Sequence, residues 1–295
     1  MKKYTYENLV SDIENLCVKY PIISRGTIGK SLVGRELPLI TVGRGKKSLL
    51  IVGTHHGMES ITSLLCIKYI EEYCRLIEGR EKISGISADL IFSERKVYIV
   101  PMLNPDGTEL HAKGGDSLNP LTERLSAMSG GDYSCWQANG RGVDLNHNYN
   151  AGFEEYKKIE PTLGIYGGGA TRYSGEYPES EPETSALCAF IKMAEPSMLI
   201  ALHTQGEEIY ADYNGVFPPN GKAIGERLSS LCGYPVSKPE PEACFGGLKD
   251  WFILEYNRPA FTIECGKGKN PLPIEDAGHI YSRIRKALLT SPIMF

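Results

Sequence analysis

The sequence predicts an α/β fold in which helices flank a twisted, largely parallel sheet. Residues 48–53 form a continuous apolar run of strand length, which is typical of a strand buried on both faces of a sheet. Similar runs lie at 198–202 and 260–264, and each of them follows a segment of helical length. Strands that alternate with helices favour a parallel sheet, because the chain must cross one face of the sheet between two parallel strands.

The individual elements follow from local spacing along the chain. An N-terminal helix is predicted over 6–19, where apolar residues recur at helical intervals at Leu9, Ile13, Leu16 and Val18. Residues 111–180 are rich in Gly, Asn, Tyr and Ser, and we expect long surface loops there of the kind that carries function. The other segments are predicted, in chain order, as strands at 23–28, 37–42 and 48–53, a helix at 61–76, a strand at 96–100, and helix–strand pairs at 183–193 with 198–202 and at 248–255 with 260–264.

Length and composition place the chain among globular proteins. Its 295 residues lie at the upper end of what one hydrophobic core organises, and no repeat or linker divides them, so we expect a single domain over 1–295. Hydrophobic residues make up 41% and charged residues 23%, which allows a large core and a hydrated surface. The net charge of −4 gives no basic field and argues against nucleic acid or a membrane surface as partner.

The start of the chain and the cysteines bear on location. Residues 1–8 reach polar sequence at once, without the apolar run of roughly 7–15 residues that a secretory signal needs. No stretch approaches the ~20 apolar residues of a membrane span. Eight cysteines are scattered without a CxxC pair, which is typical of buried thiols in a reducing compartment. These features predict a cytoplasmic protein.

A His-x-x-Glu pair follows the strand at 48–53. His56 and Glu59 lie at a strand-to-helix junction, where an imidazole and a carboxylate can face the same side of one turn. Alone the pair is a weak indication, because chance matches are common. His55 is the alternative ligand, but it lacks this spacing to the carboxylate, so we expect a structural or orienting role for it. His111 and His279 have no partner pattern and are predicted to be surface or core residues.

Two further strands end in groups that complete a metal site. The run at 198–202 is followed by His203, and the run at 260–264 ends in Glu264. In open α/β sheets, sites form outside the carboxyl ends of the strands, so we expect both side chains near His56 and Glu59. Two imidazoles and one carboxylate leave a fourth tetrahedral position for water, as in a catalytic zinc site, although cobalt or manganese would suit the same ligands. Glu264 would take the proton of that water and pass it to the leaving amine.

Several ordered motifs extend over nearly the whole chain: GKSLVGREL at 29–37, HGME at 56–59, PMLNPDG at 101–107, RGVDLN at 141–146, SEPET at 180–184, LHT at 202–204 and FTIE at 261–264. Together they resemble the zinc metallocarboxypeptidase family. The resemblance implies an eight-stranded mixed sheet flanked by helices and one Zn²⁺ ion held by His56, Glu59 and His203. It also implies that the chain is a metallopeptidase that hydrolyses a peptide bond.

The resemblance assigns roles to three further residues in the motif at 141–146. Asp144 would orient the His56 imidazole through its other ring nitrogen, which fixes the tautomer. Asn146 would contact the substrate carboxylate. Arg141 lies in the region from which the family supplies an arginine that stabilises the oxyanion of the scissile carbonyl.

Two departures from the family pattern concern the end of the substrate. Family exopeptidases follow Asn146 with an arginine that grips the terminal carboxylate with a bidentate fork, and this chain has His147 there. The position of the tyrosine that covers the site is occupied by Glu242. Lys249 falls at the base of the pocket for the residue after the cleaved bond. A buried ammonium needs a counter-charge, so this pocket should prefer a side chain with a carboxylate, unless the lysine reaches solvent.

Three segments resemble the branch of the family that cleaves γ-D-glutamyl–diaminopimelate bonds of peptidoglycan. They are LHTQGEEIY at 202–210, GLKDWFI at 247–253 and WQANGRGVD at 136–144, and Thr204 and Gln205 in the first are candidate substrate contacts. The resemblance therefore implies a small muropeptide as substrate, whose side-chain carboxylate Lys249 could receive. The alternatives are a carboxypeptidase for acidic C-terminal residues, a deacylase of N-acyl amino acids, and a peptide-binding relative without catalysis.

Overall fold

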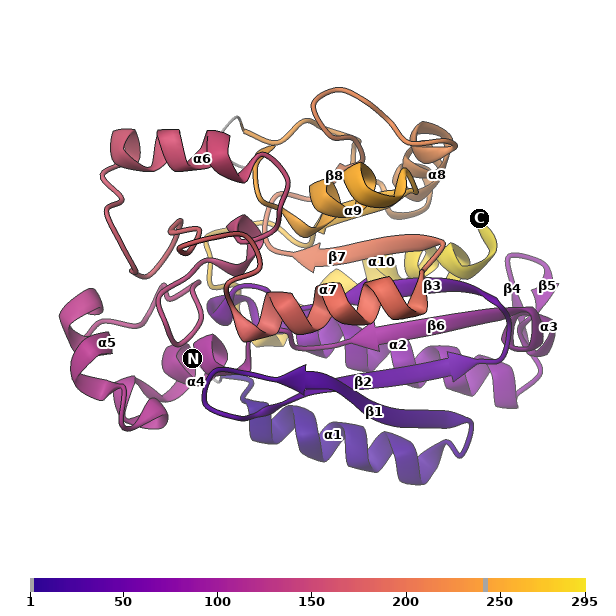
Figure 1. The fold of residues 1–295 in the computed structure, drawn as a ribbon. Helices are drawn as coiled ribbons and strands as arrows, with labels where there is room; N and C mark the ends of the chain where they lie inside the picture. Colours follow the sequence, from indigo (N-terminus) through magenta and orange to yellow (C-terminus); the bar gives the residue numbers. More distant parts are fainter. Residues whose placement is uncertain (1–2, 241–243) are drawn as a thin grey trace.

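The computed structural model describes residues 3–240 and 244–295. Glu242 lies outside these residues. A mixed seven-stranded sheet forms the centre of this structure (Figure 1). The strand order is β1-β2-β6-β3-β7-β9-β8. The strands of this sheet are β1 (Ile23–Lys30), β2 (Glu36–Gly43), β3 (Lys47–Val52), β6 (Arg95–Val100), β7 (Met198–His203), β8 (Glu208–Tyr210) and β9 (Ala260–Glu264), and a separate hairpin pairs β4 (Lys82–Ile83) with β5 (Ile86–Ser87).

The described residues form seven strands in this sheet, whereas the family resemblance implies eight. Beyond β8, Ile209 pairs with Val236 in an isolated parallel bridge. Pro235 precedes Val236, and Pro239 follows shortly after. Because proline has no backbone N–H to donate, a regular strand does not form around this bridge.

The centre of the sheet is parallel and buried on both faces, as the apolar runs predict. β6, β3, β7 and β9 pair in parallel, while β1, β2 and β8 add antiparallel strands at the two edges. Leu49 and Ile51 of β3 belong to the hydrophobic cluster on one face, and Leu50 and Val52 belong to the cluster on the other. A strand with two buried faces has no polar alternation, which is why these runs read as continuous apolar sequence.

Helices cover both faces of the sheet (Figure 1). Buried residues of α1, α2, α8 and α10 join the cluster on one face, and those of α7 and α9 join the cluster on the other. The helices are α1 (Tyr6–Lys19), α2 (Ile61–Glu78), α3 (Ala88–Glu94), α4 (Pro105–Lys113), α5 (Thr122–Ser129), α6 (Phe153–Ile159), α7 (Pro182–Ala194), α8 (Gly221–Cys232), α9 (Leu248–Tyr256) and α10 (Ala277–Thr290).

The long segment at 111–180 is more structured than predicted. It contains α5 and α6, and it supplies most of a third hydrophobic cluster with Leu118, Leu125 and Trp136 buried in it. The prediction of surface loops is therefore wrong for this part of the segment, because its few apolar residues are widely spaced and meet only in the fold. In Figure 1, α5 and α6 lie beyond the arrowheads of the central strands, so the segment borders the carboxyl edge of the sheet.

The sequence predicts free thiols and no membrane-spanning segment. The cysteines form no disulfide among the described residues, and Cys66, Cys74 and Cys188 are fully buried or nearly so. Within the same residues, the structure contains no helix that combines the length and the apolar character needed to cross a bilayer.

Candidate metal centre

Three parallel strands deliver polar side chains to one edge of the sheet. β7 ends at His203 and β9 ends at Glu264, and these two residues are register partners, so their side chains lie on the same side of the sheet. β3 pairs with β7 and ends at Val52, and the chain then reaches a one-turn helix at Gly57–Glu59. Gly57 allows this turn to lie directly against α4, because a Cβ at this position would be 2.3 Å from the backbone of Gly107.

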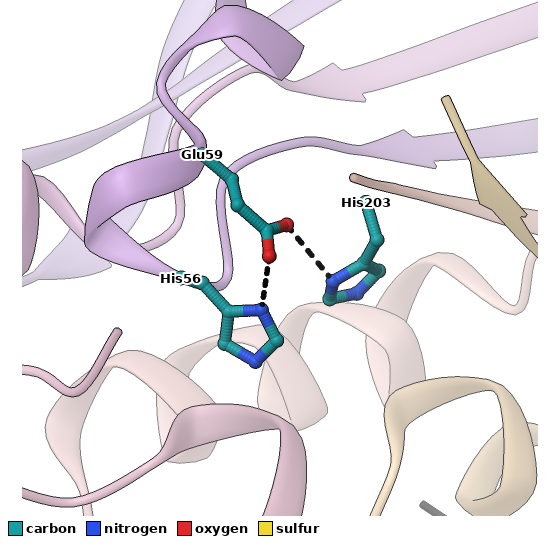
Figure 2. A group of neighbouring side chains, drawn as sticks. All are labelled: His56, Glu59 and His203. Carbon is teal, nitrogen blue, oxygen red and sulfur yellow. Dashed lines mark hydrogen bonds and ion pairs between the residues drawn. The ribbon is translucent and has the colours of Figure 1, made fainter. Parts of the chain in front are cut away.

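His56, Glu59 and His203 converge on one point (Figure 2). One ligand atom from each residue lies within 4.8 Å of the other two. The Nδ1 atom of His56 is 2.9 Å from Oε1 of Glu59, and the Nδ1 atom of His203 is 3.4 Å from Oε2. All three side chains are largely withdrawn from solvent, with 13%, 2% and 2% of their surface exposed. The structure therefore brings together the three predicted ligands.

The donor pattern of this group fits a cation. The Nε2 atom of His56 lies 3.2 Å from Oδ1 of Asp144, and a carboxylate only accepts, so Nε2 carries the proton. The Nδ1 lone pair of His56 then faces another acceptor, the Glu59 carboxylate. Two acceptors at this distance repel each other unless a proton or a metal ion lies between them. Imidazole and carboxylate ligands suit Zn²⁺.

The charges in the group favour a cation as well. Burial raises the pKa of Glu59, but attraction to His56 and His203 outweighs this effect and lowers the pKa to about 2. Burial also opposes the charged form of His56, whereas Glu59 and Asp144 hold its pKa well above the ordinary value. Desolvation and repulsion from Glu59 raise the pKa of Glu264 well above its usual range. The carboxylates of Glu59 and Asp144 therefore favour a positive charge beside them, which a proton on His56 or a metal ion supplies.

The Asp144 carboxylate is held by backbone N–H groups of residues that follow it. Its Oδ1 accepts from the backbone N–H of Asn146 at 3.2 Å, and its Oδ2 accepts from the backbone N–H of Arg172 at 3.0 Å. The Oδ1 atom of Asn139 accepts from the N–H groups of Arg141 and Val143, which closes a tight turn before Asp144. These bonds place the carboxylate against His56, as the family resemblance implies.

The other predicted residues of this loop lie in different settings. The guanidinium of Arg141 is partly exposed and lies 3.6 Å from the buried carboxylate of Glu181, and no contact with the metal group is found among the described residues. The Oδ1 atom of Asn146 accepts from the N–H of Leu248 at 3.2 Å.

His147 is held by one contact at the edge of its ring and one on a face of the ring. Its Nδ1 atom lies 2.9 Å from the carbonyl oxygen of Phe245, and the ring stacks on Tyr156 with centroids 4.1 Å apart. Burial lowers the pKa of His147, so the ring is neutral near pH 7. A neutral ring in this position does not reproduce the two-pronged grip of an arginine on a carboxylate.

Lys249 is buried and already has a counter-charge. Its ammonium donates to Oδ1 of Asp250 and to the carbonyl oxygen of Asp212. Burial raises the pKa of Asp250 to about 6 although Lys249 acts to lower it. Charge balance therefore does not require a carboxylate from the substrate in this pocket, contrary to the expectation from the sequence. Asp212 and Asp250 border a cavity of about 400 Å³ together with Tyr213 and Phe245.

Thr204 and Gln205 lie directly after His203. The backbone N–H of Thr204 donates to Oε2 of Glu59 at 3.1 Å, so this residue supports a candidate ligand. Gln205 is exposed, and its Oε1 atom accepts from the N–H of Gly268 at 3.3 Å.

The structure also clarifies His55 and adds a residue that the sequence patterns did not indicate. His55 is fully buried, lies 3.0 Å from the hydroxyl of Tyr149 through Nε2, and stacks on His203, which agrees with a structural role. Asn270 donates from Nδ2 to Oε1 of Glu59 at 3.3 Å. The Asn-Pro pair at 270–271 marks a turn in the sequence, but nothing in it indicates which residue the amide reaches.

The comparisons with known proteins agree with this geometry. A family model described as zinc carboxypeptidase matches residues 9–282. The chain is 31% identical over 283 residues to gamma-D-glutamyl-L-diamino acid endopeptidase 1 of Lysinibacillus sphaericus, covering 95% of this chain and 70% of that protein.

Solved structures show the same fold at lower sequence identity. A chain in the structure of bovine thrombin-activatable fibrinolysis inhibitor with tick carboxypeptidase inhibitor has a TM-score of 0.74 at 18% identity, covering 99% of this chain and 98% of that one. Murein-tripeptide amidase MpaA from Escherichia coli O157 has a TM-score of 0.56 at 21% identity, covering 91% of each chain.

Proposed function

The chain belongs to the zinc carboxypeptidase family, and from this premise we propose that it hydrolyses the γ-D-glutamyl–meso-diaminopimelate bond of peptidoglycan-derived peptides. It is a zinc metallopeptidase. The observation that carries the choice of substrate is the similarity to gamma-D-glutamyl-L-diamino acid endopeptidase 1, which extends over 95% of this chain.

We assign the metal ligands and the proton acceptor from the geometry at the strand ends. His56, Glu59 and His203 would hold the ion, and Asp144 would keep the proton of His56 on Nε2, so that the lone pair of Nδ1 is free for the ion. When bound, zinc acidifies the attacking water and polarises the scissile carbonyl. Glu264 stands beside His203 in the strand register, where its carboxylate would accept the proton of the water and return it to the leaving amine.

The surroundings of His147 support cleavage within the peptide rather than strict removal of a C-terminal residue. The ring is neutral and is committed to Phe245 and Tyr156, so a free terminal carboxylate would find no fork at this position. We propose that Asn146 and Arg141 still approach the substrate from the same loop, Asn146 through its side-chain amide and Arg141 through its guanidinium.

The pocket near Lys249 is the proposed site for the diaminopimelate side chain. That side chain ends in both an ammonium and a carboxylate. The ammonium of Lys249 is paired with Asp250 beside the cavity, and Asp212 and Asp250 border the cavity itself. A balanced pocket of this kind suits a zwitterionic group better than the single acidic side chain of the carboxypeptidase alternative. Thr204 and Gln205 border the metal group and are proposed as further substrate contacts.

Mass spectrometry of defined peptides tests the proposal. The zinc-loaded protein is expected to release diaminopimelate from L-Ala-γ-D-Glu-meso-diaminopimelate, and a chelator should abolish the release. The matched substrates are the same peptide with its C-terminal carboxylates amidated and an ordinary peptide that ends in glutamate. The proposal fails if the muropeptide stays intact while the ordinary peptide loses its C-terminal residue.

We also propose that the enzyme works in the cytoplasm on released muropeptides, as the sequence predicts. Eight cysteines without a disulfide among the described residues are compatible with a reducing compartment. Fractionation of the source cells, with detection of the intact protein, tests this location.

A further inference from the structure

Two loops meet behind the Glu59 carboxylate. One follows β7 and begins with Thr204, and the other follows β9 and includes Asn270. The Nδ2 atom of Asn270 donates to the carbonyl oxygen of Thr204 at 2.7 Å and to Oε1 of Glu59 at 3.3 Å. The hydroxyl of Thr204 donates to Oδ1 of Asn270 at 2.8 Å. Each polar atom of the Asn270 amide therefore has a partner, and the direction of the amide is fixed.

The Glu59 carboxylate is consequently held from both sides. Oε1 has His56 Nδ1 on one side and Asn270 Nδ2 on the other, and Oε2 has His203 Nδ1 on one side and the Thr204 N–H on the other. An ionised carboxylate offers about four lone-pair directions. Each carboxylate oxygen of Glu59 therefore has one imidazole nitrogen and one hydrogen-bond donor as neighbours. The donors thus fix the rotation of the carboxylate.

The loop that carries Asn270 is also anchored by contacts that do not involve this residue. The N–H of Gly206 donates to the carbonyl oxygen of Gly266 at 2.9 Å, and the N–H of Cys265 donates to the carbonyl oxygen of His203 at 2.8 Å. The side chain of Leu272 is buried in the main hydrophobic cluster. These contacts anchor the segment on both sides of Asn270, in addition to the two hydrogen bonds between Asn270 and Thr204. The bond from Asn270 to Glu59 is therefore an additional contact, directed at a candidate ligand.

We propose that Asn270 is a positioning residue for the metal centre, which acts through Glu59 by holding its carboxylate in the orientation that receives the ion. Groups that orient metal ligands contribute about 10–100-fold to metal affinity. The inference depends on Glu59 as a ligand and does not depend on which peptide the enzyme cleaves.

Zinc affinity, measured by competition with a chromogenic chelator, tests the proposal without a substrate. Asn270→Ala is expected to weaken zinc binding about 10–100-fold. Asn150→Ala, which changes an exposed asparagine, should leave the affinity unaltered. The absorption spectrum of the Co²⁺-loaded protein should also change in Asn270→Ala, because the spectrum reports the geometry of the ligands. A purely structural role would leave the spectrum of the fully loaded protein unchanged.

Thr204 supplies an independent pair of variants in case Asn270→Ala does not fold. Thr204→Val removes the hydroxyl that orients the amide and keeps the shape and the backbone donor, whereas Thr204→Ser keeps the hydroxyl. Zinc affinity should fall in Thr204→Val and recover in Thr204→Ser. Parent-like affinity and cobalt spectra in both Asn270→Ala and Thr204→Val would overturn the inference.

Glu59→Gln separates this inference from the metal assignment. It should lose zinc binding if Glu59 is a ligand. If Glu59→Gln binds zinc as well as the parent, the ligand assignment itself fails, and the proposal for Asn270 fails with it. If Glu59→Gln loses zinc while Asn270→Ala does not, only the positioning role is wrong.

Discussion

Glu183, at the start of α7, should make the stability of the fold fall as pH rises. Its carboxylate is fully buried, with Oε1 accepting from the N–H of Leu32 and Oε2 accepting from Nδ2 of Asn139. Burial, assisted by repulsion from Asp106, raises its pKa from 4.5 to about 7. The folded state therefore binds this proton more tightly than the unfolded state does. The stabilising effect of the proton is complete below the unfolded pKa and is lost as pH rises through the folded pKa.

The size of the effect follows from the shift. A change of 2.5 units, from 4.5 to 7, corresponds to about 3 kcal/mol at about 1.4 kcal/mol per unit. Glu183→Gln removes this titration but places an amide N–H₂ opposite the donor of Asn139, so the variant carries a constant penalty of about 1–3 kcal/mol. The decisive quantity is therefore the change with pH in the stability difference between variant and parent.

Denaturant unfolding at several pH values provides the measurement. Relative to the parent, Glu183→Gln should gain about 3 kcal/mol between about pH 4 and about pH 8. Glu154→Gln, which changes an exposed glutamate of α6, serves as the matched control and should show no such gain. Titration of the metal group affects all three proteins alike and cancels in the difference. A stability difference that stays constant across this range would refute the reasoning.

Three further predictions concern the site. Asp144→Asn should weaken zinc binding about 10–100-fold in a chelator competition, because an amide donor facing Nε2 favours the wrong tautomer of His56. Equal zinc affinity in the variant and the parent would contradict this. The exposed change Asp89→Asn is its control. Glu264→Gln should retain zinc and lose about 10²–10⁴-fold in kcat, measured with metal content on the same sample; unchanged turnover would rule out the proposed proton transfer. Lys249→Met should lower the free energy of unfolding by about 3–5 kcal/mol, since it leaves Asp250 buried without its ion-pair partner, and Lys249→Met combined with Asp250→Leu should recover most of the loss. A single variant as stable as the parent would show that the pair is not needed.

The strand ends could be predicted from the sequence because their signals are local. The apolar runs before His203 and Glu264 have the length and continuity of buried strands, and the structure places β7 and β9 at these positions. The rule that sites form beyond the carboxyl ends of parallel strands then located the metal group. The helix at 6–19 was predicted with its observed bounds, since its apolar spacing coincides with a capping box at Thr5 and Asn8.

Features that depend on distant contacts were not predictable in the same way. Asn270 reaches Glu59 across 211 positions of sequence. Lys249 and Asp250 are adjacent in sequence, but only the fold shows that both side chains are buried and paired with each other. Trp136 and Leu125 form a cluster that exists only after the segment at 111–180 has folded onto itself. Composition alone describes such a segment as polar loops, because the few apolar residues that organise it are far apart in the chain.

The order of the central strands has a consequence for how the protein responds to metal depletion. His56 and Glu59 follow β3 and His203 ends β7, and these two strands are distant in sequence and adjacent in the sheet, so an unfolded chain offers no comparable site. Zinc then binds the native state alone, and by mass action it adds about 4 kcal/mol to stability when free zinc exceeds its dissociation constant about 1,000-fold. Cells that run short of zinc would lose activity and the resistance of the protein to proteolysis together.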